Sequence, residues 1–167
     1  MKFSEYKDPK QLLEMGYDSE VGEENSISNQ DRGYCLERIM EIIAKNDERI
    51  EVMISYSKNI RDDEGGQHDL VFEWKEKYVY FECKWRKDPI GSEVISELFG
   101  KNPNSSLGLI TMSRVTNEAM SKIKNIRSRG IPFLLIERKE VHALVQAYNP
   151  SILSQRKSFQ TYFKSNL

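Results

Sequence analysis

The sequence predicts an α/β protein with one mixed five-stranded sheet flanked by helices. Strand-like patterns in the first half of the chain are joined by short connections, which favour antiparallel pairing. In the second half, apolar strand patterns alternate with helical ones, and strands linked in this way join a sheet in parallel through right-handed crossovers. The length of 167 residues suits a single domain with its own core.

The first regular helix is expected after Ser28. Ser28 with Asp31 three residues later is a capping-box-like start. The segment GYCLERIMEIIAKN then repeats apolar residues at the i, i+3, i+4, i+7 spacing of a helix that packs one face on a core. The residues of this stripe are Leu36, Ile39, Met40 and Ile43.

Three strands are expected after this helix. Residues 51–57 alternate apolar and polar side chains, and a polar loop containing glycine, residues 61–68, follows them. The segment DLVFEWKEKYVYFECKW, residues 69–85, has the pattern of two strands joined by a tight turn, formed either by Lys75 and Glu76 or by Trp74 to Lys77. In such a hairpin the numbers of paired residues sum to 151, which places Asp69 opposite Glu82.

The remaining elements alternate between helices and buried strands. The expected helices cover residues 91–100, 116–130 and 139–148, and the expected strands cover residues 107–112 and 131–137. Residues 1–27 are acidic and weakly patterned, and we expect an N-terminal extension with at most a short helix. Residues 28–147 form the main domain in this interpretation, and residues 148–167 form a C-terminal tail that packs on the domain or on an interface.

Composition indicates an ordinary globular protein, because 31% of the residues are charged and the net charge is only −1. The longest apolar run, residues 131–136, is too short to cross a bilayer, and the N-terminus has no signal-peptide core. We therefore expect a cytoplasmic protein without a membrane partner. Cys35 and Cys83 fall in a predicted helix and a predicted strand, where buried free thiols are expected rather than a disulfide, and no zinc-binding spacing occurs.

Charge is unevenly distributed along the chain. Residues 1–83 hold 11 Lys and Arg against 20 Asp and Glu, whereas residues 84–167 hold 14 against 6, so the net charges are −9 and +8. The basic half could face a polyanion, and it could equally consist of helices with solvated outer faces.

Three ionisable residues of the predicted hairpin are expected on one face of the sheet. Opposed residues of an antiparallel pair share a face, so Asp69 and Glu82 lie together, and Lys84 is two residues beyond Glu82. Two neighbouring carboxylates repel each other unless a cation or a proton lies between them. Mg²⁺ suits paired carboxylates and water, and Lys84 can then orient or deprotonate that water or neutralise charge that develops during a reaction.

This D…E-x-K arrangement resembles the PD-(D/E)XK nuclease superfamily, and the surrounding sequence is most similar to its Mrr-type restriction endonuclease branch. Four further segments carry the resemblance: a first-helix signature, a Gly-rich approach to the catalytic Asp, the helix after the E-x-K strand, and a strand that turns into a helix. They are GYCLERI (33–39), EGGQHD (64–69), IGSEVISELFGKN (90–102) and SSLGLITMSRVTNEA (105–119). The resemblance covers about residues 28–147 and implies a restriction-endonuclease-like core with a nuclease-like catalytic domain.

The resemblance implies roles for particular residues. Asp69 and Glu82 would be metal ligands, with the backbone carbonyl of Cys83 near the metal and Glu37 supporting the metal site from the first helix. Lys84 would position the attacking water and stabilise developing charge. Two positions depart from the branch: Glu82 stands where Gln is frequent, and His68 stands where a small apolar residue is usual.

These roles predict a Mg²⁺-dependent endonuclease, with Mn²⁺ as a substitute metal, that hydrolyses DNA phosphodiester bonds in restriction or defence. Arg86, Lys87 and Arg114 are the expected DNA contacts near the site. No separate DNA-reading module is visible, so a homodimer or a subunit directed by a partner protein is expected. Two alternatives remain: a structure-selective nuclease resembling Holliday junction resolvases, and a non-catalytic subunit that uses the nuclease fold for DNA binding or assembly.

Each site residue also has a plainer interpretation. Glu82 and Lys84 could be solvent-facing residues of an exposed sheet face, Asp69 could end a loop, and Glu37 could be an exposed helix acid. Glu73 shares the predicted face of Asp69 and is a reserve ligand. Six further residues are expected to have a structural or solvated role: His68, His142, Lys122, Lys124, Arg127 and Arg129.

Overall fold

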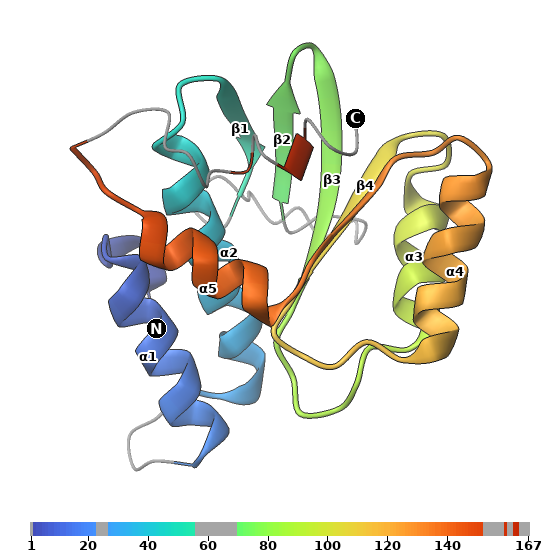
Figure 1. Cartoon of the computed structure of the whole chain (residues 1–167). Coiled ribbons are helices and arrows are strands. Elements are labelled where there is room, and N and C mark those ends of the chain that lie inside the picture. The colour runs from blue at the N-terminus through green and yellow to red at the C-terminus, as the bar shows by residue number, and fades with distance from the viewer. Residues whose placement is uncertain (1, 23–26, 56–69, 152–158, 160–161, 164–167) are drawn as a thin grey trace.

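The computed structural model describes residues 2–22, 27–55, 70–151, 159 and 162–163 (Figure 1). In chain order the elements are η1 (a 3-10 helix, Phe3–Glu5), α1 (Pro9–Glu20), α2 (Asn29–Lys45), β1 (Ile50–Ile54), β2 (Leu70–Trp74), β3 (Lys77–Lys84), α3 (Ser92–Lys101), β4 (Ser106–Thr111), α4 (Asn117–Ser128), β5 (Phe133–Ile136) and α5 (Arg138–Ala147).

One sheet holds the strands in the order β1-β2-β3-β4-β5. β1 pairs antiparallel with β2, and β2 pairs antiparallel with β3. β3 pairs parallel with β4, and β4 pairs parallel with β5. The predicted α/β fold with a mixed five-stranded sheet is therefore confirmed, and β3 is the strand where the antiparallel and parallel halves meet.

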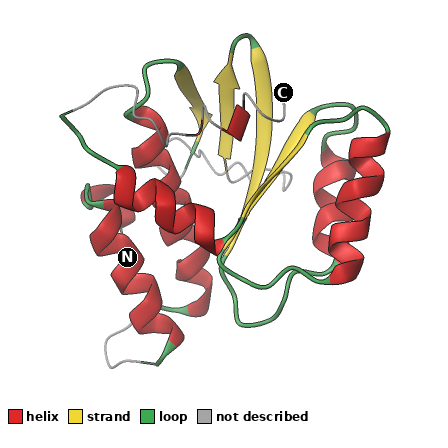
Figure 2. Ribbon diagram, viewed as in Figure 1, coloured by secondary structure: helices red, strands yellow, loops and turns green. Residues whose placement is uncertain are grey.

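Helices cover both faces of this sheet (Figures 1 and 2). α1, α2 and α5 lie on one side, and α3 and α4 lie on the other. The apolar residues divide in the same way into two cores, because alternate residues of a strand point to opposite faces. The first core includes Leu36, Met40, Phe72, Phe81, Cys83, Trp85 and Leu144, and the second includes Ile95, Leu98, Leu107, Leu109 and Ile123.

The N-terminal region contains a longer helix than the sequence pattern indicated. α1 has 12 residues, with Pro9 in its first turn and the Asp8 side chain accepting a hydrogen bond of 3.0 Å from the amide of Lys10. Leu12 is fully buried in the first core. The expectation of at most a short helix was wrong. The apolar face of α1 is narrow, and α1 packs against α2, a separate helix whose contacts with α1 cannot be seen in the local sequence pattern.

Gly16 lets α1 approach the sheet closely. A Cβ atom at Gly16 would lie 2.0 Å from Cη2 of Trp85, far inside van der Waals contact. Trp85 is only 2% exposed and directly follows the end of β3. The close packing of α1 on the residue after β3 therefore depends on the missing side chain.

α2 agrees with the predicted amphipathic helix. Ser28 caps it, accepting a hydrogen bond of 3.1 Å from the amide of Asp31 and donating one of 2.8 Å to the Asp31 carboxylate. The four residues of the predicted apolar stripe are all buried in the first core: Leu36, Ile39, Met40 and Ile43.

The hairpin register is the one predicted for the part of the hairpin that the structure describes. The pairs run from Trp74 with Lys77 to Leu70 with Phe81, so each pair sums to 151. Lys75 and Glu76 form the turn with φ angles of 49° and 65°, as in a two-residue type I′ turn. β1 ends at Ile54, and residues 56–57 of the expected strand lie outside the described residues. The register of β1 with β2 shifts between Val52 and Ile54, as at a β-bulge.

Each of the later elements begins and ends within two residues of its predicted boundaries. Cys35 and Cys83 are buried free thiols, as expected. Phe159 and Phe163 are fully buried, and their rings contact Phe72 and Trp74 of β2 with centroid distances of 5.3 and 5.5 Å respectively. None of the helices in the described ranges has the length and apolar character needed to cross a membrane.

Candidate active site at the carboxyl end of β3

Glu82 and Lys84 end the middle strand of the sheet. Val79, Phe81 and Cys83 belong to the first core, so the alternation of β3 places Glu82 and Lys84 on the opposite face. Nζ of Lys84 lies 3.0 Å from Oε1 of Glu82, and the two side chains are 34% and 16% exposed. They form a partly buried ion pair.

Asp69 and His68 lie outside the described residues, as does the EGGQHD segment that contains them. The last hydrogen-bonded pair before them is Leu70 with Phe81. One further step in the same register would pair Asp69 with Glu82, and this pairing stays a prediction.

Glu37 lies in the middle of α2 and is only 3% exposed. It lines a cavity of about 270 Å³ together with Gly33, Cys83 and Lys84. A Cβ atom at Gly33 would lie 4.0 Å from the carbonyl oxygen of Cys83, with no nearer contact, so α2 passes close to the end of β3 here. The interpretation of Glu37 as an exposed helix acid is therefore wrong, since its carboxyl group is buried beside this cavity.

Lys84 is the residue that the Glu82 ion pair and the cavity of Glu37 have in common. It lines the cavity that Glu37 lines, and its ammonium group contacts Glu82. Within the described ranges, no three His, Cys, Asp or Glu side chains lie close enough together to hold a metal ion. The described part of the site thus offers the carboxylate of Glu37 and the residue Cys83 at the cavity, with Glu82 paired to Lys84. This set fits a hard divalent cation only when a further oxygen ligand such as Asp69 joins it.

Glu73 does not belong to this group. It pairs with Tyr78 near the hairpin turn, four residues from Glu82 along β3, which corresponds to about 13 Å of strand. The reserve role considered for Glu73 at the same metal site is therefore excluded by the register.

A second cavity, of about 380 Å³, adjoins the first and is rich in cations. It is lined by Ser19, Glu20, Arg32, Arg86, Lys87, Met112, Ser113, Arg114 and Arg138, and we call it the basic pocket. Arg86 lines both cavities. The predicted DNA contacts Arg86, Lys87 and Arg114 are thus brought together beside Lys84.

The basic pocket arises from the parallel half of the sheet. β3, β4 and β5 end at the same edge, and each is followed within three residues by Arg or Lys. Arg86 and Lys87 follow β3, Arg114 follows β4 and Arg138 follows β5. Arg138 was missed in the sequence analysis, although its place directly after a predicted parallel strand was a usable signal. Arg32 had no such signal, because it reaches the pocket from the first turn of α2.

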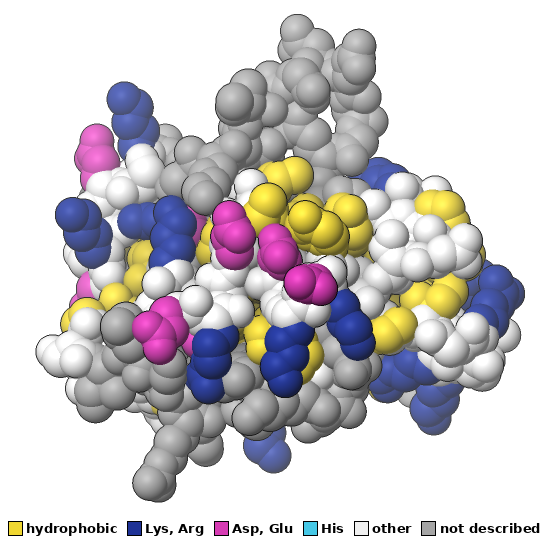
Figure 3. Space-filling model, turned by 90° about the horizontal axis from the view of Figure 1, so that it is seen from above, with side chains coloured by type: hydrophobic (Ala, Val, Ile, Leu, Met, Phe, Trp, Pro, Cys, Tyr) yellow, Lys and Arg dark blue, Asp and Glu magenta, His cyan; other side chains and the backbone are white. Residues whose placement is uncertain are grey.

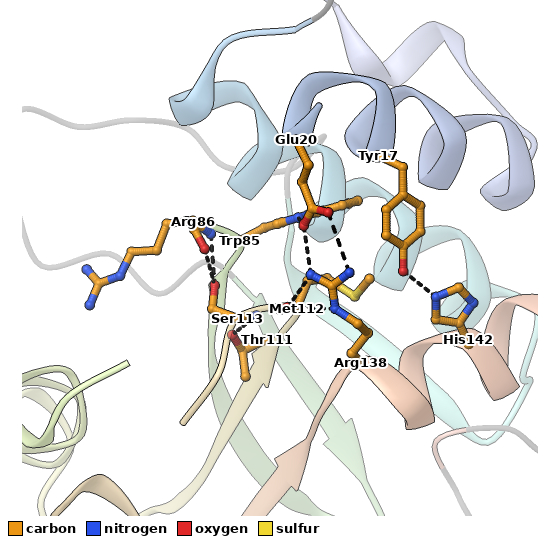
Figure 4. Close-up of polar contacts among 9 residues, drawn as sticks. All are labelled: Tyr17, Glu20, Trp85, Arg86, Thr111, Met112, Ser113, Arg138 and His142. Atoms are coloured by element: carbon orange, nitrogen blue, oxygen red, sulfur yellow. Dashed lines mark hydrogen bonds and ion pairs between the residues drawn. The ribbon is translucent and has the colours of Figure 1, made fainter. Parts of the chain in front are cut away.

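Hydrogen bonds fasten the loops around the basic pocket (Figure 4). The hydroxyl of Ser113 donates to the carbonyl of Arg86 at 2.8 Å and accepts from the amide of Arg86 at 2.9 Å. The amide of Ser113 in turn donates to Oγ1 of Thr111 at 2.9 Å. The loop after β3 is therefore tied to the loop after β4.

Arg138 and Glu20 form the opposite wall (Figure 4). Arg138 donates through Nε and Nη2 to the carbonyl of Met112, at 2.9 and 2.7 Å, and through Nη2 to Glu20 at 2.7 Å. Nε1 of Trp85 donates to the same Glu20 oxygen at 2.6 Å. Burial alone would raise the pKa of Glu20, but the hydrogen bonds from Arg138 and Trp85, with the charges of Arg138 and Arg32, lower it below its ordinary value.

Within the described ranges, the basic side chains on and next to α4 line neither cavity. Lys124, Arg127 and Arg129 are exposed on or next to α4, as the solvated interpretation expected. His142 contacts the hydroxyl of Tyr17 and not the cavities. Figure 3, which views the molecule from above, shows acidic and basic side chains close together on this face.

No protein-family model, curated protein or solved structure matches this chain.

Proposed function

We propose that the protein is a cytoplasmic, metal-dependent DNA endonuclease of restriction or defence type, with a restriction-endonuclease-like core. The observation that carries the proposal is the position of Lys84. Its ammonium group lies 3.0 Å from Glu82, and the residue lines a cavity with the buried Glu37, next to a pocket lined by five basic residues. The order of these residues on a hairpin resembles the PD-(D/E)XK pattern.

Mg²⁺ is the proposed metal, with Mn²⁺ as a substitute. Asp69, Glu82, Glu37 and the carbonyl of Cys83 are the groups that would hold it. Once bound, the ion would lower the pKa of a water ligand and neutralise negative charge on the phosphate.

The side chains of this chain contribute positioning and charge. Glu82 pairs with the ammonium group of Lys84, which would donate hydrogen bonds to the attacking water and to phosphoryl oxygens. Fixed donors of this kind stabilise charge that develops in the transition state. Arg86, Lys87 and Arg114 supply contacts to the DNA backbone, and contacts of this kind dominate the affinity of proteins for DNA.

Nicking of supercoiled plasmid tests the proposal. Wild-type protein with Mg²⁺ should nick the plasmid, and EDTA should abolish nicking. Lys84→Ala should reduce the rate by about 100-fold or more, the size expected when one electrostatic donor is removed. Lys122→Ala is the matched control, because it removes a lysine from α4, which lines neither cavity.

Thermal unfolding of each variant shows whether a lost activity reflects lost structure. If folded wild-type protein nicks no form of DNA with either metal, the enzyme proposal fails and the non-catalytic DNA-binding subunit takes its place. Equal rates for Lys84→Ala and wild type would also refute it. Branched and linear substrates compared at equal concentration distinguish a junction-resolving nuclease from restriction-like cutting.

The proposed enzyme acts as a homodimer or as a subunit that a partner directs, since no separate sequence-reading module is visible in the sequence. Light scattering of the purified protein, alone and with DNA, measures which assembly forms.

A further inference from the structure

We infer that the basic pocket is a phosphate-binding subsite, which holds one phosphate of a DNA strand next to the bond that is cut. The inference rests on the proposed function, because it assigns a second contact to the same substrate. It adds Arg32 and Arg138 to the expected DNA contacts and describes a walled pocket in place of a basic surface.

Charge balance is the first argument. Among the described residues, the pocket is lined by Arg32, Arg86, Lys87, Arg114 and Arg138 against one carboxylate, that of Glu20. Glu20 is already engaged by Arg138 and Trp85. Arginine cannot lose its proton at any accessible pH, so the excess positive charge persists. An anion is the group that would offset it.

Burial is the second argument. Arg32 is only 4% exposed, and burying a guanidinium group costs free energy that anionic partners offset. Arg32 also acts on Glu20 through its charge, which places it close to the wall that Arg138 forms. A cation fixed in this way is positioned for an anion without the entropy loss of a long surface side chain.

Availability of donors is the third argument. Among the residues that the structure describes, the side chains of Lys87 and Arg114 make no hydrogen bond or ion pair, and both are exposed at the rim. Arg86 is partly engaged, since its Nη2 donates to the carbonyl of Pro89 at 3.1 Å and lies 3.6 Å from Glu93. Lys87 and Arg114 are therefore the donors that an incoming phosphate would meet first.

Space and position favour a phosphate of the substrate. The volume of about 380 Å³ is many times the share of one water molecule, roughly 30 Å³, so a hydrated phosphate group fits. The pocket shares Arg86 with the cavity of Glu37 and Lys84. A strand bound with one phosphate here would pass directly beside Lys84.

Two kinds of DNA phosphate share this chemistry, a 5′-terminal phosphate and an internal phosphodiester. Fluorescence anisotropy with a short labelled duplex distinguishes them when the duplex carries either a 5′-phosphate or a 5′-hydroxyl end. EDTA in the buffer prevents cleavage, so the measured quantity is binding alone. The variant is Lys87→Ala/Arg114→Ala, and the control is Lys122→Ala/Lys124→Ala, which removes the same number of charges from α4.

We expect the pocket variant to bind DNA about tenfold or more weakly than wild type, with a shallower dependence of affinity on salt, because phosphate contacts are lost. The control should bind like wild type. A wild-type preference for the 5′-phosphate that the variant loses assigns the terminal phosphate, and an equal loss for both duplexes assigns an internal one.

The inference is overturned when the pocket variant binds both duplexes as tightly as the control variant, or when wild type binds neither. Plasmid nicking by wild type, measured separately, distinguishes this outcome from failure of the proposed function. Pocket-dependent binding without plasmid nicking by wild type would remove the endonuclease proposal and keep the phosphate subsite.

Discussion

Replacing Gly16 by alanine should weaken the protein and disturb the end of β3. The new Cβ would lie 2.0 Å from Cη2 and 2.3 Å from Cζ3 of Trp85, so the indole ring or α1 must move. Overpacking of this kind costs about 1–3 kcal/mol. Alanine recovers part of that cost, roughly 0.5–1 kcal/mol, because it is a better helix former than glycine.

Gly100→Ala is the matched control for this substitution. Gly100 also lies in a helix, α3, and a Cβ atom there would have no neighbour within 4 Å. It should show only the gain in helix propensity. The difference between the two variants therefore isolates the steric cost at Trp85.

Thermal unfolding gives the magnitude. A net loss of about 1–2 kcal/mol lowers the midpoint by roughly 2–8 °C for a chain of this size, whereas Gly100→Ala should leave the midpoint unchanged or raise it. Because Trp85 directly follows Lys84, plasmid nicking by Gly16→Ala should also slow at a temperature where the variant is folded. If Gly16→Ala is as stable as Gly100→Ala, the packing argument is refuted.

Two further substitutions test other contacts. Glu20→Gln should lower the free energy of unfolding near neutral pH by about 1 kcal/mol, a modest value because the partner Arg138 is exposed to solvent. The folded-state pKa of Glu20 lies below its ordinary value of 4.5, so this contribution to stability is present above pH 4.5 and is lost as the pH falls through the folded-state pKa. Urea unfolding at several pH values should therefore show that the stability difference between Glu20→Gln and wild type shrinks in acid. A difference that stays constant with pH contradicts this prediction. Lys75→Asn/Glu76→Gly should stabilise the hairpin by about 1 kcal/mol in urea unfolding, because both positions have positive φ and Asn-Gly suits a type I′ turn. A loss of stability would show that the present side chains make compensating contacts.

Much of the fold follows from patterns that are local in sequence. Leu36, Ile39, Met40 and Ile43 repeat at helical spacing, and one face of α2 is buried in consequence. The hairpin register follows from a turn of two residues, since the turn alone fixes which residues face each other. These features need no knowledge of the rest of the chain.

The features that were not predicted depend on contacts between remote segments. α1 is anchored by Trp85 and α2, and neither contact leaves a mark in the weakly patterned residues 1–27. The burial of Glu37 likewise depends on how closely α2 crosses β3 at Gly33. Arg32 joins the basic pocket from α2 although 54 residues separate it from Arg86 in the sequence. Spacing along the chain cannot predict such meetings, because packing of separate elements creates them.

The strand order leaves the candidate active site two strands from each border of the sheet. β1 and β5 are the edge strands, and each has one side without a strand partner among the described elements. A second copy or another protein could extend the sheet at either border by adding a strand. Neither addition would alter the backbone pairing that holds Glu82 and Lys84. In this architecture the chain can therefore assemble with a partner through an edge strand without a change at the candidate active site.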